Sequence, residues 1–212
     1  MEAAFWHQRW ESGEIAFHEA KPHRFLRAHW DKLNLEESSV VFLPLCGKSL
    51  DIDWLLTLGH CVVGVELNAG AVEEVFARLG LIPQRDEFEG LERLRAGHLT
   101  VYVGDFFKLG QAHLGAVSGV FDRGALVALP DAMRRDYVSH LAALTPGARS
   151  LTVSYAYEEG QTQGPPFSVP FADVEALFAA THTARQIDSA PINGPLAHRC
   201  EGDEIATMLT PR

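Results

Sequence analysis

The sequence is poor in basic residues and has no long apolar run. Lysine and arginine total 18 against 28 aspartates and glutamates, which gives a formal net charge of −10 at pH 7. Such a surface repels phosphate backbones, and no basic cluster offsets it, so we do not expect nucleic acid as a partner. No apolar run approaches the roughly 20 residues needed to span a bilayer, so no membrane contact is expected either. A small neutral or cationic ligand suits this charge better.

Cysteine is scarce, and its number is odd. The three cysteines are widely spaced, at Cys46, Cys61 and Cys200. This pattern predicts reduced thiols in a cytosol rather than a disulfide framework. The first residues, MEAAFWHQRW, have no charged region followed by an apolar core, so no signal peptide is apparent. We therefore expect a soluble cytoplasmic protein.

Patterns of metal ligands are missing as well. The ten histidines include His18, His23 and His29, which are five and six positions apart. No H-x-x-x-H or C-x-x-C set accompanies them, so no metal site is expected.

Strands and helices alternate from about residue 39 onward. We expect strands at 40–43, at 60–67, within 98–107, within 117–126 and at 148–157. We expect helices at 50–58, 71–80, 132–145 and 172–182. This order predicts an α/β fold whose mostly parallel sheet is covered by helices on both faces. Short helices within 2–13 and 21–33 precede the first strand, and the tail shows only weak alternation near 205–209.

The first expected strand ends in a turn with one glycine. The apolar run from Val40 to Leu45 meets Gly47, where a nucleotide-binding helix would begin. The pyrophosphate of NAD or FAD requires a G-x-G-x-x-G turn, in which several glycines admit the phosphates to a helix N-terminus. S-adenosylmethionine (SAM) has no phosphate, so one glycine suffices. The turn therefore favours SAM over a dinucleotide, although a plain tight turn also explains Gly47.

Two further strand ends carry residues that suit an adenosine ligand. Glu66 ends the second strand, 19 positions after Gly47, where an acidic side chain accepts hydrogen bonds from ribose hydroxyls. Gly104, Asp105 and Phe106 follow the third strand, and we expect the acid to bond the adenine amine and the ring to stack on the base. The alternative is that Glu66 is only a surface acid.

Five segments resemble the thiopurine S-methyltransferase family, in the family's order. They are FWHQRWESGEIAFHE (5–19), FLPLCGKSLDIDWL (42–55), GHCVVGVEL (59–67), FDRGALVAL (121–129) and GPPFSVPFADVEALF (164–178). The resemblance fades after about residue 180. It implies a Rossmann-like, seven-stranded class I SAM-dependent methyltransferase fold in a single domain, 1–212. Within that domain it implies an N-terminal helical lid at 1–38, a cofactor-binding core at 39–157 and a substrate-side segment at 158–212.

The resemblance also implies an activity. The family transfers the methyl group of SAM to aromatic and heterocyclic thiols such as thiopurines, and leaves S-adenosylhomocysteine (SAH). Its bacterial-type members are linked to methylation of selenium and tellurium species and so to tellurite resistance. We expect a small-molecule acceptor and a monomeric enzyme.

The family's SAM contacts fall here on Trp10, Leu45, Glu66 and Arg123, with Gly47 in the same turn. Arg123 is expected to bind the SAM carboxylate or to favour the thiolate form of the acceptor, and so counts as the catalytic residue. The alternative is a local ion pair with Asp122. Lys48 either contacts the methionine carboxylate or starts a helix in solvent, and Trp6 is expected in the core.

The acceptor side is less sharply marked. Phe17 belongs to the lid, and Pro165, Pro166 and Phe167 form either an apolar wall of the acceptor pocket or a turn that only caps the next helix. Arg199 is a candidate for the family's basic residue near the substrate.

Transfer from a sulfonium to sulfur is an in-line displacement that needs positioning in a dry pocket rather than a strong base. It needs no covalent enzyme intermediate, so Cys46 is assigned to packing. Two other hypotheses remain open at this point: a Rossmann-fold NAD(P)-dependent oxidoreductase and a non-catalytic SAM-binding protein.

Overall fold

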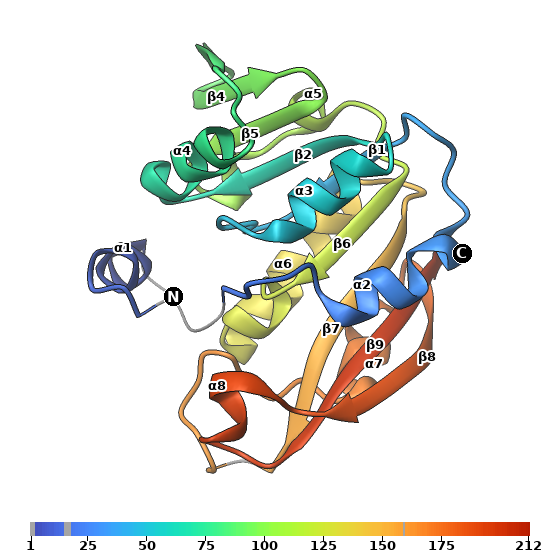
Figure 1. Cartoon of the computed structure of the whole chain (residues 1–212). Helices are drawn as coiled ribbons and strands as arrows, with labels where there is room; N and C mark the ends of the chain where they lie inside the picture. Colours follow the sequence, from blue (N-terminus) through green and yellow to red (C-terminus); the bar gives the residue numbers. More distant parts are fainter. Residues whose placement is uncertain (1–2, 15–17, 159) are drawn as a thin grey trace.

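A central sheet organises the chain. The computed structural model describes residues 3–14, 18–158 and 160–212, and within them nine strands form one sheet in the order β3-β4-β5-β2-β1-β6-β7-β9-β8 (Figure 1). The strands are β1 Val40–Leu43, β2 Cys61–Glu66, β3 Gln84–Phe88, β4 Leu91–Ala96, β5 Leu99–Val103, β6 Gly119–Arg123, β7 Arg149–Tyr157, β8 His182–Pro191 and β9 Gly202–Pro211. The five central strands, from β5 to β7 in this order, pair in parallel, which confirms the expected α/β class.

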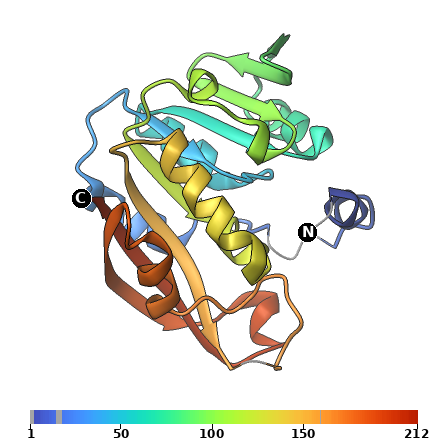
Figure 2. The ribbon, with the colours of Figure 1, turned by 180° about the vertical axis from the view of Figure 1, so that it is seen from behind.

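Helices cover both faces of the sheet. They are α1 Ala3–Glu11, α2 Arg24–His29, α3 Leu50–Thr57, α4 Ala69–Arg78, α5 Gln111–Leu114, α6 Asp131–Leu144, α7 Phe171–Phe178 and α8 Gly194–Ala197, with short 3-10 turns at Trp30–Leu33 (η1), Phe106–Lys108 (η2) and Leu126–Ala128 (η3). Helices α2, α3 and α4 lie on the face toward the viewer in Figure 1, and α6 lies on the opposite face, as Figure 2 shows. Two apolar clusters, one on each face, form the core.

The expected number of seven strands is wrong, because β3 and β4 form an additional hairpin on the edge beside β5. Its turn at Glu89 and Gly90 has positive φ at both residues, 46° and 83°, which matches the twist of a two-residue hairpin. Strand β3 has no buried residue. The hairpin therefore lacks the continuous apolar run by which the central strands were recognised.

The expected helical lid at 1–38 is also too long. Phe25, Leu26, Trp30 and Leu33 are at most 5% exposed and belong to the core cluster on the α3 side. Helix α2 and η1 therefore cover the sheet and cannot lift from it without exposing that core. Helix α1, by contrast, stands apart from the sheet in both views (Figures 1 and 2).

The C-terminal tail forms two long antiparallel strands. Strand β9 lies between β7 and β8, and both pairings are antiparallel. The weak alternation near 205–209 falls inside β9, whereas β8 was not expected. Among the described residues, no helix combines the length and the apolar character needed to cross a membrane.

Candidate cofactor and acceptor pocket

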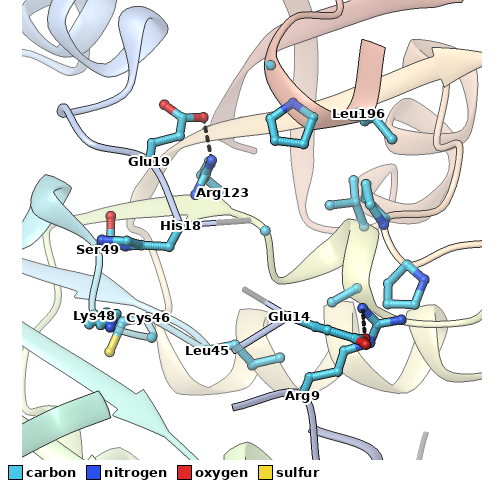
Figure 3. A pocket seen from close by; sticks show the side chains of 18 of the residues that line it. Arg9, Glu14, His18, Glu19, Leu45, Cys46, Lys48, Ser49, Arg123 and Leu196 are labelled. Atoms are coloured by element: carbon cyan, nitrogen blue, oxygen red, sulfur yellow. Dashed lines mark hydrogen bonds and ion pairs between the residues drawn. The ribbon is translucent and has the colours of Figure 1, made fainter. Parts of the chain in front are cut away.

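A cavity of about 400 Å³ lies at the carboxyl ends of the central strands. Its size is typical of sites that take small molecules. It sits where the strand order reverses between β1 and β6, which is where doubly wound sheets bind ligands. Its walls come from α1 and the chain after it, the turn after β1, the ends of β2, β6, β7 and β9, the loop at 164–167, and α8 (Figure 3).

The turn after β1 forms one wall. Leu45 and Gly47 both have positive φ, 47° and 52°, so the backbone turns sharply with a bulky side chain in a conformation that usually favours glycine. A Cβ on Gly47 would lie 3.4 Å from the ring of Trp10, an ordinary van der Waals distance, so the indole lies beside the turn and the positive φ is what favours glycine here. Trp6 also lines the cavity, against the expectation that it lies in the core.

Lys48 is engaged beside this turn. Its Nζ lies 2.6 Å from Oε2 of Glu74 and 5.8 Å from the centre of the Trp10 ring. Lys48 is thus a cation in the cavity wall, with a carboxylate partner on α4.

Glu66 ends β2 at the cavity and is 7% exposed. Its Oε2 accepts a hydrogen bond from the backbone N–H of Gly47, and its Oε1 accepts one from Asn68, both at 2.9 Å. Burial raises the pKa of the carboxyl, and the backbone donors oppose that rise. Each carboxylate oxygen can accept a further bond, so Glu66 can still bind ribose hydroxyls. The reading of Glu66 as a surface acid is wrong.

Arg123 ends β6 and lines the cavity with its side chain 12% exposed. Its Nη2 is ion-paired with Oε1 of Glu19 (Figure 3). The alternative of a pair with Asp122 is wrong, because Asp122 turns into the core, where it accepts bonds from the Tyr137 hydroxyl and the Leu126 N–H. Burial raises the pKa of Asp122 to about 6, against the effect of those two bonds.

The segment expected at the adenine does not line this cavity. Phe106 is 4% exposed, and its ring packs against Phe42 and Tyr137. The carboxylate of Asp105 accepts the Phe107 N–H, and Gly104 donates its N–H to the Glu66 carbonyl at 2.9 Å. The segment is therefore tied to the Glu66 strand end, and its contact with adenine stays a prediction.

The opposite wall holds the expected acceptor residues in part. Pro165 and Pro166 line the cavity, as does Arg199, whose guanidinium donates to the Thr162 hydroxyl. Phe167 lies outside the lining; its backbone N–H donates to the Val127 carbonyl. Phe17 lies outside the described residues.

No pattern in the sequence marks the buried polar group behind Arg123. Tyr155 on β7 and Glu204 on β9 are direct cross-strand neighbours, and both line the cavity. Glu204 accepts bonds from His23 Nε2 at 3.0 Å and from Arg24 Nε at 2.9 Å. Burial raises the pKa of Glu204, but these two partners outweigh it and hold the pKa below its usual value. The cavity wall thus contains a carboxylate that stays ionised.

The donor set of the cavity fits SAM. One glycine in the turn, a buried carboxylate at the next strand end and an indole on the turn suit an adenosine with no phosphate. In the described part of the chain, no group of three His, Cys, Asp or Glu side chains could hold a metal ion.

Comparisons with known proteins agree with this geometry. The sequence profile described as Thiopurine S-methyltransferase (TPMT) matches residues 1–202. Two proteins named thiopurine S-methyltransferase are similar over almost the whole chain. The one from Xanthobacter autotrophicus is 44% identical over 210 residues, 99% of each chain. The one from Teredinibacter turnerae is 40% identical over 210 residues, 99% of this chain and 98% of that one.

Solved structures resemble the fold at low identity. A Burkholderia thailandensis 1,6-didemethyltoxoflavin-N1-methyltransferase, with 1,6-didemethyltoxoflavin and SAH bound, superposes with a TM-score of 0.61 at 17% identity, over 98% of this chain and 87% of that one. A SAM-dependent methyltransferase from Anabaena variabilis superposes with a TM-score of 0.65 at 12% identity, over 99% and 95%. These likenesses establish the fold alone.

Proposed function

Because this chain belongs to the thiopurine S-methyltransferase family, we propose that it methylates the sulfur of aromatic or heterocyclic thiols. The family expected from the sequence is thereby confirmed, and the chain is a methyltransferase with SAM as its methyl donor. The acceptor is the proposed part. The observation that carries the proposal is the apolar wall of Pro165 and Pro166 beside Arg199, in the same cavity as the buried Glu66 carboxylate.

We assign the cofactor half of the cavity to the turn after β1 and to α1. Glu66 accepts the ribose hydroxyls, Leu45 and Gly47 give the near wall, and Trp10 covers the adenosine. A sulfonium is also attracted to an aromatic face, which Trp10 and Trp6 offer. When bound, SAM supplies an electrophilic methyl group.

We assign the acceptor half to the wall of Pro165, Pro166 and Arg199. Two prolines give a rigid apolar surface against which a flat ring can lie and exclude water. A cation beside a thiol lowers the pKa of that thiol and favours the thiolate, which is the nucleophile. We assign that role to Arg123, which ends β6 and lines the cavity.

The test is transfer of a labelled methyl group from SAM to a panel of acceptors. Thiophenol and 6-mercaptopurine are expected to become labelled, while their matched oxygen analogues, phenol and hypoxanthine, are not. Selenite and tellurite form a second arm, which tests whether metalloid species are acceptors too. Binding of SAH without transfer to any acceptor would instead support a non-catalytic SAM-binding protein, and tight binding of NADH would support the oxidoreductase.

Two further expectations stay predictions. A location in the cytoplasm rests on the reduced cysteines, and the monomeric state awaits a measurement of mass in solution. Both are independent of the acceptor panel.

A further inference from the structure

Arg123 sits in a buried cluster of opposite charges. Its guanidinium is largely covered, and the carboxylates of Glu19 and Asp51 and the neutral hydroxyl of Tyr155 lie around it. Burial lowers the pKa of Arg123, but these neighbours outweigh it and hold the pKa above its usual value. The guanidinium therefore stays charged and needs a counter-ion.

Two nearby carboxylates are fixed by other partners. Asp51 is 3% exposed and accepts the His23 N–H at 2.7 Å and the Ser49 hydroxyl at 2.6 Å. Glu204, beyond Tyr155, is 4% exposed and is held by His23 and Arg24. Neither carboxylate can leave its place without exposing buried polar groups that would lose their partners.

Glu19 differs from both. Its side chain is 40% exposed, and in the part of the chain that the structure describes its hydrogen-bond partner is Arg123. A half-exposed carboxylate regains water when it turns away, so its departure costs little. The cost falls on Arg123, because a largely buried guanidinium loses its ion pair with Glu19. Glu19 therefore leaves most readily when another anion takes its place.

Both residues line the cavity that we assign to SAM and its acceptor. We propose that Glu19 is a resident counter-ion, displaced from Arg123 by an anionic group of the bound ligand, and that it thereby sets the selectivity of the pocket for anionic ligands. The proposal rests on the proposed function, since it takes the ligand to be SAM or the acceptor. The anion has two possible sources: the amino-acid carboxylate of the cofactor, or a negative charge on the acceptor.

The experiment measures binding by calorimetry to the full chain and to its Glu19→Gln variant. SAH is compared with its decarboxylated analogue S-adenosyl-3-thiopropylamine, which keeps the amine and loses only the carboxylate. In a second arm, 4-methylbenzenethiol, which ionises to a thiolate, is compared with its methyl sulfide, which stays neutral, in the presence of SAH. If Glu19 is paired with Arg123 in about nine unliganded molecules out of ten, Glu19→Gln is expected to bind the anionic ligand about tenfold more tightly. Its affinity for the neutral analogue is expected to stay unchanged. The arm that changes identifies the source of the anion.

Glu14→Gln is the matched control. Glu14 lies in the same wall and pairs with Arg9 at 3.5 Å. The substitution therefore removes an equal charge without changing the pair of Glu19 and Arg123. In each arm, the ratio of the affinities for the anionic and the neutral ligand is expected to be the same for Glu14→Gln as for the unmodified protein. Glu19→Ala, which removes the whole side chain, must change the ratio in the same direction as Glu19→Gln.

Melting temperatures give a second readout. Glu19→Gln is expected to melt earlier than the unmodified protein when no ligand is present, and to gain more from SAH. Weaker binding of SAH by Glu19→Gln, or an equal change in affinity for the anionic and the neutral ligand of each arm, would overturn this proposal and leave the proposed function standing. Failure of the unmodified protein to bind SAH at all would overturn the proposed function with it.

Discussion

The backbone N–H of Gly47 donates a hydrogen bond of 2.9 Å to Oε2 of Glu66, 19 positions further along the chain. The bond joins the turn after β1 to the end of β2. Glu66 therefore has two tasks, since it fixes the shape of the turn and also faces the cavity.

Glu66→Gln separates the role of Glu66 in the turn from its role in ligand binding. Glutamine keeps one carbonyl acceptor for a backbone N–H but presents an NH₂ group in place of the second oxygen. We expect SAH to bind more weakly by about 1 to 3 kcal/mol, because ribose hydroxyls lose an acceptor in a buried site. Glu66→Ala should lose as much affinity and more stability, because the Gly47 and Asn68 N–H groups also lose their acceptors. Unchanged calorimetric affinity in both variants would show that the ribose lies elsewhere.

Arg123→Ala should lower turnover far more than stability. The free Glu19 carboxylate can turn into water, so we expect a loss of about 1 kcal/mol or less in the free energy of unfolding. Turnover should fall at least about tenfold, because the thiolate loses a cation worth on the order of one pKa unit or more. Arg149→Ala is the control, since Arg149 bonds the Leu33 carbonyl outside the cavity wall. A collapse of the melting temperature of Arg123→Ala would point to a structural role.

Arg199→Ala should raise the KM for the thiol acceptor and leave SAH affinity nearly unchanged. Arg199 shares a wall with Pro165 and Pro166, whereas Glu66 and Gly47 lie on the cofactor side. A lost charged hydrogen bond corresponds to about a tenfold rise in KM. Arg199→Lys keeps the charge and should restore part of the loss. An equal effect on SAH binding and on KM would remove Arg199 from the acceptor side.

Asp122 should make the protein less stable as pH rises from about 4 to 6. Its folded pKa, about 6, lies above the ordinary value of 3.8, so the folded state holds the proton more tightly than the unfolded state over that range. The loss is on the order of 2 to 3 kcal/mol and is complete above the folded pKa. Asp122→Asn cannot titrate, so urea unfolding of the two proteins at several pH values isolates this group. Parallel pH profiles would contradict the raised pKa.

Cys46 should be unreactive in the folded protein. It is 8% exposed, and burial, together with the charge of Glu66, raises the pKa of its thiol. Cys61 is more exposed, with its Sγ 3.2 Å from His98 Nδ1. A disulfide reagent is expected to modify Cys61 first and Cys46 only after unfolding, and Cys61→Ser should remove the fast phase. Fast modification of Cys46 would contradict its assignment to packing.

The sequence predicted the strands whose residues are buried on both faces. Strands β1 and β2 are apolar and almost fully buried, and a strand–turn–helix pattern follows each. The hairpin β3–β4 and strand β8 were missed because they lie at the edges of the sheet with many exposed residues. Their many polar and exposed side chains resemble those of a surface loop.

The candidate site divides in the same way. Leu45, Gly47, Glu66 and Arg123 could be predicted because each stands at the end of a parallel strand, and such ends meet at one edge of the sheet. Glu204 and Glu19 could not, because they reach the cavity through the antiparallel strand β9 and through the chain that follows α1. No local pattern marks such residues.

The sequence by itself determined the fold class, because buried strands leave apolar runs in the chain, and its resemblance to the family, together with the single glycine, predicted the cofactor and the cofactor turn. Only the tertiary structure decided which charges meet. Glu19 and Arg123 are 104 positions apart, and His23 and Glu204 are 181 apart. Such pairs form because packing against the sheet brings segments together that are distant in the sequence. A charge buried there is stabilised only by an opposite charge on a neighbouring segment.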